Sequence, residues 1–279
     1  MRAAVYLLVL LAGQAWAETP LERGEYLVRG LGHCGACHTP RNALQAERAD
    51  AWLQGGQAEG WQAPALTGNA LAHWQLDELS QYLRSGRAAG QPNAAGPMAR
   101  VIEQSLSHLS DADLNAIAFY LEQVPGPATA PVALTTPALL PTRGEAREAD
   151  SAHWSGAQLF DAWCASCHQP EARGRGAMPT LAGTVLAQRV ASGNLVRIIL
   201  DGTGQAEGPS MPGFADELSD EQVSRLVTAL GAPPVTAAEV ARQRSATHQA
   251  ATTGWLAVMG VMGAAALWMG WALRRRRPH

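Results

Sequence analysis

Two short runs in this sequence of 279 residues have side chains that could hold a cofactor. They read C-G-A-C-H at residues 34–38 and C-A-S-C-H at residues 164–168, and they contain all 4 cysteines of the chain. In a C-x-x-C-H run the two thiols can add to the vinyl groups of a haem, which places the adjacent imidazole beneath the iron. We therefore expect two covalently bound haem c groups, held by Cys34, Cys37, Cys164 and Cys167 and ligated by His38 and His168.

A C-x-x-C pair has two other common uses, as a redox dithiol or as half of a zinc site. A redox dithiol normally follows a strand in a βαβ pattern, which this sequence does not show. A four-cysteine zinc site explains neither the histidine after both pairs nor the signal peptide that residues 1–17 predict at the start of the chain. Haem attachment is therefore the preferred interpretation of both motifs.

Matching elements flank the two motifs. A short helical segment precedes each motif, and a P-x-L-x-G run follows it, at residues 64–68 and 179–183. Each unit then has an apolar helix and a closing helix, which begins at a capping serine, Ser110 or Ser219, and repeats apolar residues at helical spacing. The pattern predicts an all-α fold built from a duplicated small domain.

Both ends of the sequence have features of membrane signals. Residues 3–12 are apolar and lead to Ala15-Trp16-Ala17, a small-x-small run that predicts a signal peptide. Residues 255–273 carry no charge, have the length of one spanning helix and end at four arginines. Because such arginines favour the cytoplasmic side, we expect a bacterial inner-membrane protein with its haem domains in the periplasm and its C-terminus in the cytoplasm.

The expected fold class is all-α, with two tandem small domains and one C-terminal transmembrane helix. Five prolines between residues 125 and 141 indicate an extended linker between the domains. The expected segments are a signal peptide (1–17), domain 1 (18–123), a Pro-rich linker (124–150), domain 2 (151–232), a tether (233–253), the transmembrane helix (254–273) and an arginine tail (274–279).

With C-x-x-C-H near its start, P-x-L-x-G after it and a closing helix, each unit resembles a small class I cytochrome c domain. In that family the proline carbonyl of P-x-L-x-G accepts a hydrogen bond from Nδ1 of the proximal histidine. The resemblance therefore implies that Pro64 orients His38 and that Pro179 orients His168, since such a bond fixes the tautomer and the direction of a ligating imidazole.

The sixth iron ligands are sought among the methionines. Three lie outside the leader and the predicted membrane helix: Met98, Met178 and Met211. Met98 comes shortly before Ser110, and Met211 holds the equivalent place before Ser219. The duplication therefore favours Met98 and Met211 as axial ligands, and Met178 is the alternative in the second unit.

The first unit carries a more specific resemblance. T-P-R-N directly after the first motif, Gly60-Trp61 before Pro64 and the run G-P-M at residues 96–98 resemble the cytochrome c subunits of membrane-bound alcohol, gluconate and related dehydrogenases. The resemblance implies electron transfer from a periplasmic dehydrogenase subunit to a quinone or oxidase acceptor. Outside the haem motifs the sequence has no cysteine, no nucleotide-binding glycine pattern after a strand and no non-haem metal cluster, so we expect no catalytic residue and a protein that is not itself an enzyme.

The net charge of the chain argues against one class of partner, and two alternative functions fit the sequence less well. Between residues 18 and 250 there are 16 arginines and 24 acidic residues, a formal charge of −8, so nucleic acid is not an expected partner. A two-haem peroxidase needs an open or displaceable distal site, whereas both units offer a methionine. A two-haem subunit of a terminal oxidase typically has its anchor before the haem domains, and here the predicted anchor follows them.

Overall fold

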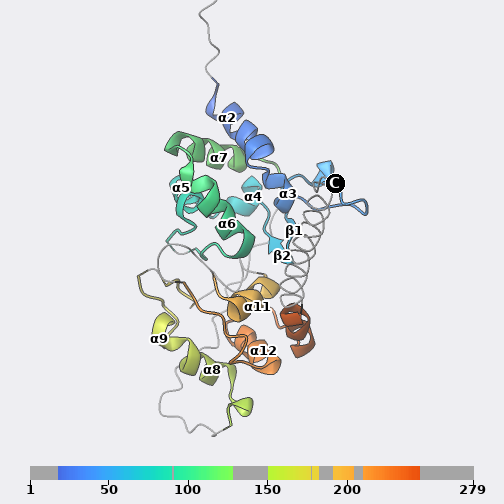
Figure 1. The fold of residues 1–279 in the computed structure, drawn as a ribbon. Helices are drawn as coiled ribbons and strands as arrows, with labels where there is room; N and C mark the ends of the chain where they lie inside the picture. The colour runs from blue at the N-terminus through green and yellow to red at the C-terminus, as the bar shows by residue number, and fades with distance from the viewer. Residues whose placement is uncertain are drawn as a thin grey trace, which may run out of the picture. The chain divides into compact units, whose positions relative to one another are not determined.

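The structure is a computed structural model that describes residues 18–89, 91–127, 150–176, 178–181, 191–203 and 210–245 (Figure 1). The chain divides into two compact units. The first contains the described residues up to 127, and the second contains those from 150 onwards.

The first unit consists of helices and one small hairpin. Helix α2 (Pro20–Tyr26) continues as a π-helical turn (Leu27–Leu31) and is followed by the short helix α3 (Cys34–His38). Strands β1 (Gly56–Ala58) and β2 (Trp61–Ala63) pair antiparallel. The other helical segments are a 3-10 turn (Ala49–Ala51), α4 (Gly68–Leu71), α5 (Leu76–Ser85), α6 (Gly96–Gln104), a second 3-10 turn (Leu106–His108) and α7 (Asp111–Gln123).

The second unit shares with the first a helix before the motif, a motif turn, an apolar helix and a closing helix. Its elements are a 3-10 turn (Ser151–His153), α8 (Gly156–Trp163), α9 (Ala165–His168), α11 (Ser192–Asp201) and α12 (Asp220–Ala229). Residues 237–245 are also helical, and Val240 is fully buried in the core of this unit. Arg244 donates to Asp220 at 2.9 Å and to the carbonyl of Leu218. Residues 233–245, the described part of the expected tether (233–253), therefore pack against the core of the second unit.

Local sequence signals set several of the helix starts. Helix α7 begins after the capping residue Ser110, and α12 begins after Ser219, which forms a capping box with Gln222. Helix α8 begins with the same kind of box, formed by Ser155 and Gln158. In each box the serine hydroxyl and the glutamine side chain satisfy backbone N–H groups that lack a partner inside the helix.

In each unit the helix before the motif crosses the closing helix at a glycine. A Cβ on Gly24 of α2 would lie 2.6 Å from Cβ of Tyr120 on α7, and closer still to the carbonyl oxygen of Ala116. A Cβ on Gly156 of α8 would lie 2.6 Å from Cβ of Ala229 on α12. Both positions need glycine because the helix backbones approach too closely for a side chain.

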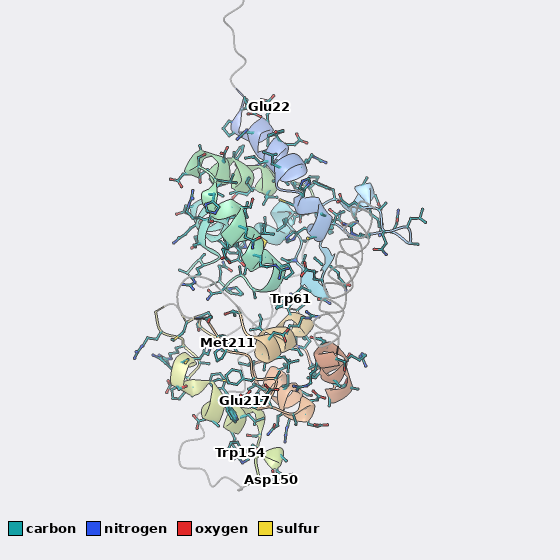
Figure 2. The ribbon with its side chains drawn as sticks, in the orientation of Figure 1. Glu22, Trp61, Asp150, Trp154, Met211 and Glu217 are labelled. Atoms are coloured by element: carbon teal, nitrogen blue, oxygen red, sulfur yellow. The ribbon has the colours of Figure 1, made fainter. Side chains whose placement is uncertain are left out.

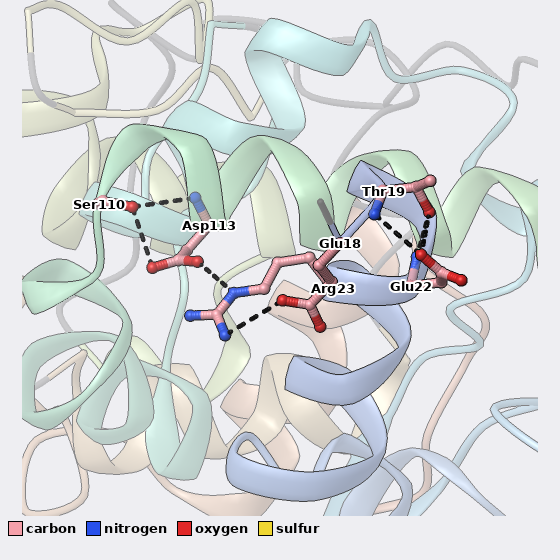
Figure 3. A network of polar contacts seen from close by, with 6 residues as sticks. All are labelled: Glu18, Thr19, Glu22, Arg23, Ser110 and Asp113. Carbon is pink, nitrogen blue, oxygen red and sulfur yellow. Dashed lines mark hydrogen bonds and ion pairs between the residues drawn. The ribbon is translucent and has the colours of Figure 1, made fainter. Parts of the chain in front are cut away.

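Polar contacts reinforce the crossing of α2 and α7 (Figure 3). Nε of Arg23 donates to the carboxylate of Asp113 at 2.7 Å, and another guanidinium nitrogen lies 3.8 Å from the carboxylate of Glu18. The hydrogen bond from Arg23 is the main cause that lowers the pKa of Asp113. Thr19 and Glu22 form a capping box at the start of α2. These contacts fix the helix that runs into the first C-x-x-C-H motif.

Each unit has its own apolar core, built from residues at helical spacing. The fully buried side chains of the first core include Val28, Leu53, Leu114 and Leu121. Those of the second core include Leu159, Val196, Val223 and Leu226. Both cores join the helix before the motif to the closing helix, so they hold the motif against the rest of its unit.

The expected fold class needs one correction, which concerns the C-terminal transmembrane helix. Within the described ranges no helix is long and apolar enough to cross a membrane. Even α7, with 13 residues, falls short of the roughly 20 that a bilayer requires. The predicted span 254–273 lies outside the described residues, as do the predicted signal peptide and most of the linker. The described part of the structure thus supports two helical domains, and it supports neither the expected C-terminal transmembrane helix nor the expected inner-membrane location with a cytoplasmic C-terminus.

Candidate haem-binding sites

In the first unit α3 places the C-x-x-C-H motif on a single helical turn. His33, in the left-handed region at φ 49°, ends the preceding segment and lets α3 begin at Cys34. His38 at the end of α3 is buried, and its Nδ1 lies 2.7 Å from the carbonyl oxygen of Pro64. Because a carbonyl only accepts, Nδ1 carries the proton and donates, which leaves the Nε2 lone pair available to a metal.

The second unit has the same arrangement on α9. His168 is buried, and its Nδ1 donates to the carbonyl oxygen of Pro179 at 3.1 Å. The chain returns to this position in a tight turn, in which the N–H of Gly174 donates to the carbonyl of His168 at 3.0 Å. Gly174 has φ +70°, and a Cβ there would lie 2.6 Å from the carbonyl oxygen of Pro179. The turn therefore needs glycine at this position.

Burial sets the protonation of both imidazoles. It lowers the pKa of His38 and of His168, while the hydrogen bonds to the proline carbonyls act in the opposite direction. A lowered pKa keeps each imidazole neutral near pH 7, which is the form that ligates a metal.

The four thiols lie beside these imidazoles and form no disulfide. Cys34, Cys37 and Cys164 are half-buried, and Cys167 is exposed. Burial raises the pKa of Cys34 to about 11 and that of Cys164 to about 12. A reactive dithiol shows the opposite shift, because the thiolate is its working form. Two cysteines on one turn, next to an imidazole with one free nitrogen, fit a haem bound through thioethers.

Met98 and Met211, predicted as sixth ligands, lie on different kinds of segment. Met98 belongs to the first turn of α6 and packs half-buried against the first core. Met211, marked in Figure 2, lies in the chain between α11 and α12 and is also half-buried. Its backbone pairs with Thr203: Met211 N donates to the Thr203 hydroxyl, and Thr203 N donates to the Met211 carbonyl, both at 3.1 Å.

Met178, the alternative ligand, lies directly before Pro179. Its backbone forms an isolated bridge with Arg175, with reciprocal N–H to carbonyl bonds of 3.1 and 3.2 Å. It is therefore held in the segment that supplies the partner of His168 Nδ1.

Several residues near the first motif escaped prediction from the sequence. A Cβ on Gly35 would overlap the ring of Trp52, which packs against the first core and lies 4.5 Å from the guanidinium of Arg29, measured to the ring centroid. Trp61 packs in the same way on Gly96, two residues before Met98. The sequence offers a glycine close to each functional residue, and Trp61 as part of the resemblance, but neither reveals which ring covers which glycine.

Both halves of the chain match families of cytochromes. Residues 21–125 match Cytochrome c, and residues 152–228 match Cytochrome C oxidase, cbb3-type, subunit III. The chain therefore contains cytochrome c domains, as the resemblance of both units implied, and such domains imply covalently bound haem c.

Three relatives that align with most of this chain are all named as cytochrome subunits of dehydrogenases. The fructose dehydrogenase cytochrome subunit of Gluconobacter japonicus is 37% identical in an alignment of 227 residues that covers 73% of this chain and 46% of that protein. The alcohol dehydrogenase (quinone) cytochrome c subunit of Gluconobacter oxydans is 34% identical in an alignment of 271 residues that covers 86% of this chain and 54% of the relative. The gluconate 2-dehydrogenase cytochrome c subunit of Pantoea cypripedii is 36% identical in an alignment of 234 residues that covers 76% of this chain and 52% of the relative.

The chain thus spans about half the length of these relatives. Their names confirm the predicted resemblance to the cytochrome c subunits of alcohol, gluconate and related dehydrogenases.

Proposed function

We propose that this protein is an electron-transfer subunit with two covalently bound haem c groups that accepts electrons from a dehydrogenase. One observation carries the proposal: each C-x-x-C-H turn presents a buried histidine whose Nδ1 is bonded to a backbone carbonyl, at 2.7 Å from Pro64 and at 3.1 Å from Pro179. This arrangement orients a ligand toward a single iron. The names of the relatives support the dehydrogenase as donor.

Each residue of the proposed site has a defined task. The two thiols of a motif bind the haem covalently, and the histidine supplies one axial nitrogen through Nε2. Pro64 and Pro179 fix the imidazole direction by accepting the Nδ1 proton. The haem iron supplies the change in oxidation state, whereas ligand identity and burial set its potential.

Met98 and Met211 are the proposed sixth ligands. Met178 adjoins Pro179, so it lies in the segment that contacts the Nδ1 edge of His168. Because Nε2 is the nitrogen that remains for the iron, a place on the Nδ1 side of the ring counts against Met178, and the duplication favours Met211. A methionine in both sites also supports electron transfer over the two-haem peroxidase, which needs a distal site open to peroxide.

The acceptor is a quinone or an oxidase. The family match of the second domain, to Cytochrome C oxidase, cbb3-type, subunit III, favours one further candidate, a two-haem subunit of a terminal oxidase. Copurification discriminates the two roles. A dehydrogenase that copurifies and reduces the haems with fructose, ethanol or gluconate supports the first, and a copurifying haem-copper oxidase supports the second.

Haem stoichiometry tests the site itself. Wild-type protein matured in a host that attaches haem c should retain two haems after denaturation and extraction with acidic acetone. The variant Cys34→Ala/Cys37→Ala should retain one, and its matched control Cys164→Ala/Cys167→Ala should also retain one. A wild type that retains fewer than two haems would contradict the proposal.

A further inference from the structure

The first unit contains a β-hairpin between its histidine and its proline. Pro64 follows His38 by 26 residues, whereas Pro179 follows His168 by 11. Part of the additional chain forms β1 and β2, in which Ala58 lies opposite Trp61. The two residues between them, Glu59 at φ 52° and Gly60 at φ 78°, are both in the left-handed region, as a tight hairpin turn requires.

One end of the hairpin is fixed to the haem-attachment turn. The N–H of Gly55 donates to the carbonyl of His38 at 2.8 Å. A Cβ on Gly56 would lie 2.9 Å from the carbonyl oxygen of Thr39 and closer to that of Cys37, so β1 packs directly on the backbone at the end of α3. Strand β2 leads into Pro64, which binds His38 Nδ1. The hairpin therefore begins and ends on the histidine side of the site.

The other end of the hairpin reaches α6, the helix that carries Met98. A Cβ on Gly96 would lie 2.7 Å from two ring atoms of Trp61, so the indole covers the backbone of the first α6 residue. Arg100 on the same helix pairs with Glu59 at 2.6 Å. Both of these charged side chains are more than half exposed, so the ion pair contributes little and the indole contact carries most of the attachment.

We infer that the hairpin is a brace between the two iron ligands of the first haem, and that Trp61 is the residue that positions Met98. The inference rests on the proposed function, because it takes His38 and Met98 as ligands of one iron. Trp61 holds the start of α6 at a set distance from the segment that orients His38. Removing its ring frees the first turn of α6, so the Met98 sulfur leaves the iron more readily.

In the second unit the corresponding segment, residues 169–178, contains no aromatic residue. The brace therefore acts on the first haem alone.

Imidazole binding to the oxidised protein measures how firmly the methionine is held, since imidazole ligates only after the methionine departs. In the full chain with Cys164→Ala/Cys167→Ala, a single haem remains at residues 34–38 and reports on Met98. Adding Trp61→Ala should raise the imidazole affinity about tenfold, equivalent to about 1.4 kcal/mol. It should also weaken the absorption band of the methionine–iron bond. Trp61→Phe retains a flat ring and should stay within about twofold of the parent.

Two further variants separate positioning from stability. Gly96→Ala displaces the indole from the other side and should raise the affinity as Trp61→Ala does, which keeps the test available if Trp61→Ala does not fold. Gly24→Ala disturbs a helix crossing away from the hairpin. It should lower the unfolding temperature without raising the imidazole affinity.

The outcomes distinguish the brace from the proposed function. If Trp61→Ala and Gly96→Ala bind haem but bind imidazole no more tightly than the parent, the brace is refuted and the haem assignment stands. If Gly24→Ala raises the affinity as much as Trp61→Ala, loss of stability explains the effect and the brace is again refuted. If no haem attaches at residues 34–38 in the parent, the proposed function fails and the brace fails with it.

Discussion

At the crossing of α2 and α7 we can estimate how much one added methyl group lowers the free energy of unfolding. At Gly24 the added Cβ would lie 2.6 Å from Cβ of Tyr120, where ordinary contact begins at 3.4 Å, and it would overlap the Ala116 carbonyl more strongly. Both helices must separate, because these neighbours include backbone that cannot rotate away. Overpacking of this kind costs about 1–3 kcal/mol, and we expect Gly24→Ala to fall in the upper half of that range. For a domain of this size each kcal/mol lowers the unfolding temperature by about 4–8 °C.

Gly30 provides the matched control for this prediction. It lies in the same helical segment, yet its Cβ would meet only the ring of Tyr26, at 3.7 Å, which is ordinary contact. Gly30→Ala should therefore leave the stability unchanged or raise it by up to about 1 kcal/mol through helix propensity. Thermal unfolding followed by far-UV circular dichroism and by haem absorbance measures both variants. Equal effects of the two substitutions, or a Gly24→Ala protein within about 0.5 kcal/mol of wild type, would refute the reasoning.

Three further predictions concern the ligands, the helix crossing and the partner. Met98→Ala and Met211→Ala should each abolish one methionine–iron absorption band and lower the potential of that haem, while Met178→Leu leaves both bands; loss of a band in Met178→Leu would make Met178 the ligand. The pKa of Asp113 is lowered in the fold by Arg23, so its contribution to stability is present above the ordinary value of 3.8 and is lost as pH falls through the lowered pKa. Urea unfolding should therefore show Asp113→Asn less stable than wild type at pH 7 and approaching it in acid, and a difference that stays constant with pH would contradict this. Haem reduction by the copurifying dehydrogenase, followed by stopped flow, should slow as salt rises if the −8 charge of residues 18–250 steers docking to a basic face; a rate independent of salt would exclude such steering.

Features that depend on a few neighbouring residues could be predicted from the sequence. The helix starts at Ser110 and Ser219 are observed where capping residues were expected, because a cap requires only a hydroxyl and nearby backbone N–H groups. The backbone carbonyls of Pro64 and Pro179 accept hydrogen bonds from Nδ1 of the predicted histidines. This pairing came from the resemblance to cytochrome c domains, since nothing in the spacing alone shows which carbonyl meets Nδ1.

Features that depend on distant packing could not be predicted. The hairpin has strands of only three residues, and its place is set by contacts with α3 and α6 rather than by alternating polarity. The close helix crossing at Gly24 depends on Ala116, more than ninety residues along the chain. Residues 233–245 looked like a polar tether, yet a single buried side chain, Val240, and the Arg244–Asp220 pair attach them to the second core. The membrane helix expected from hydropathy has no counterpart among the described residues.

The two units solve one local problem with different lengths of chain. Each unit must bring a backbone carbonyl to the Nδ1 of a buried histidine. Because the proline side chains take no part in these bonds, the bonds constrain the backbone at Pro64 or Pro179 but place little constraint on the chain between the histidine and the proline. In the second unit a tight glycine turn makes the return in 11 residues. In the first, 26 residues make it, and the additional chain extends to the helix of Met98. Two sites with the same motif can therefore differ in how they hold the proposed sixth ligand, and that difference resides in the intervening segment rather than in C-x-x-C-H.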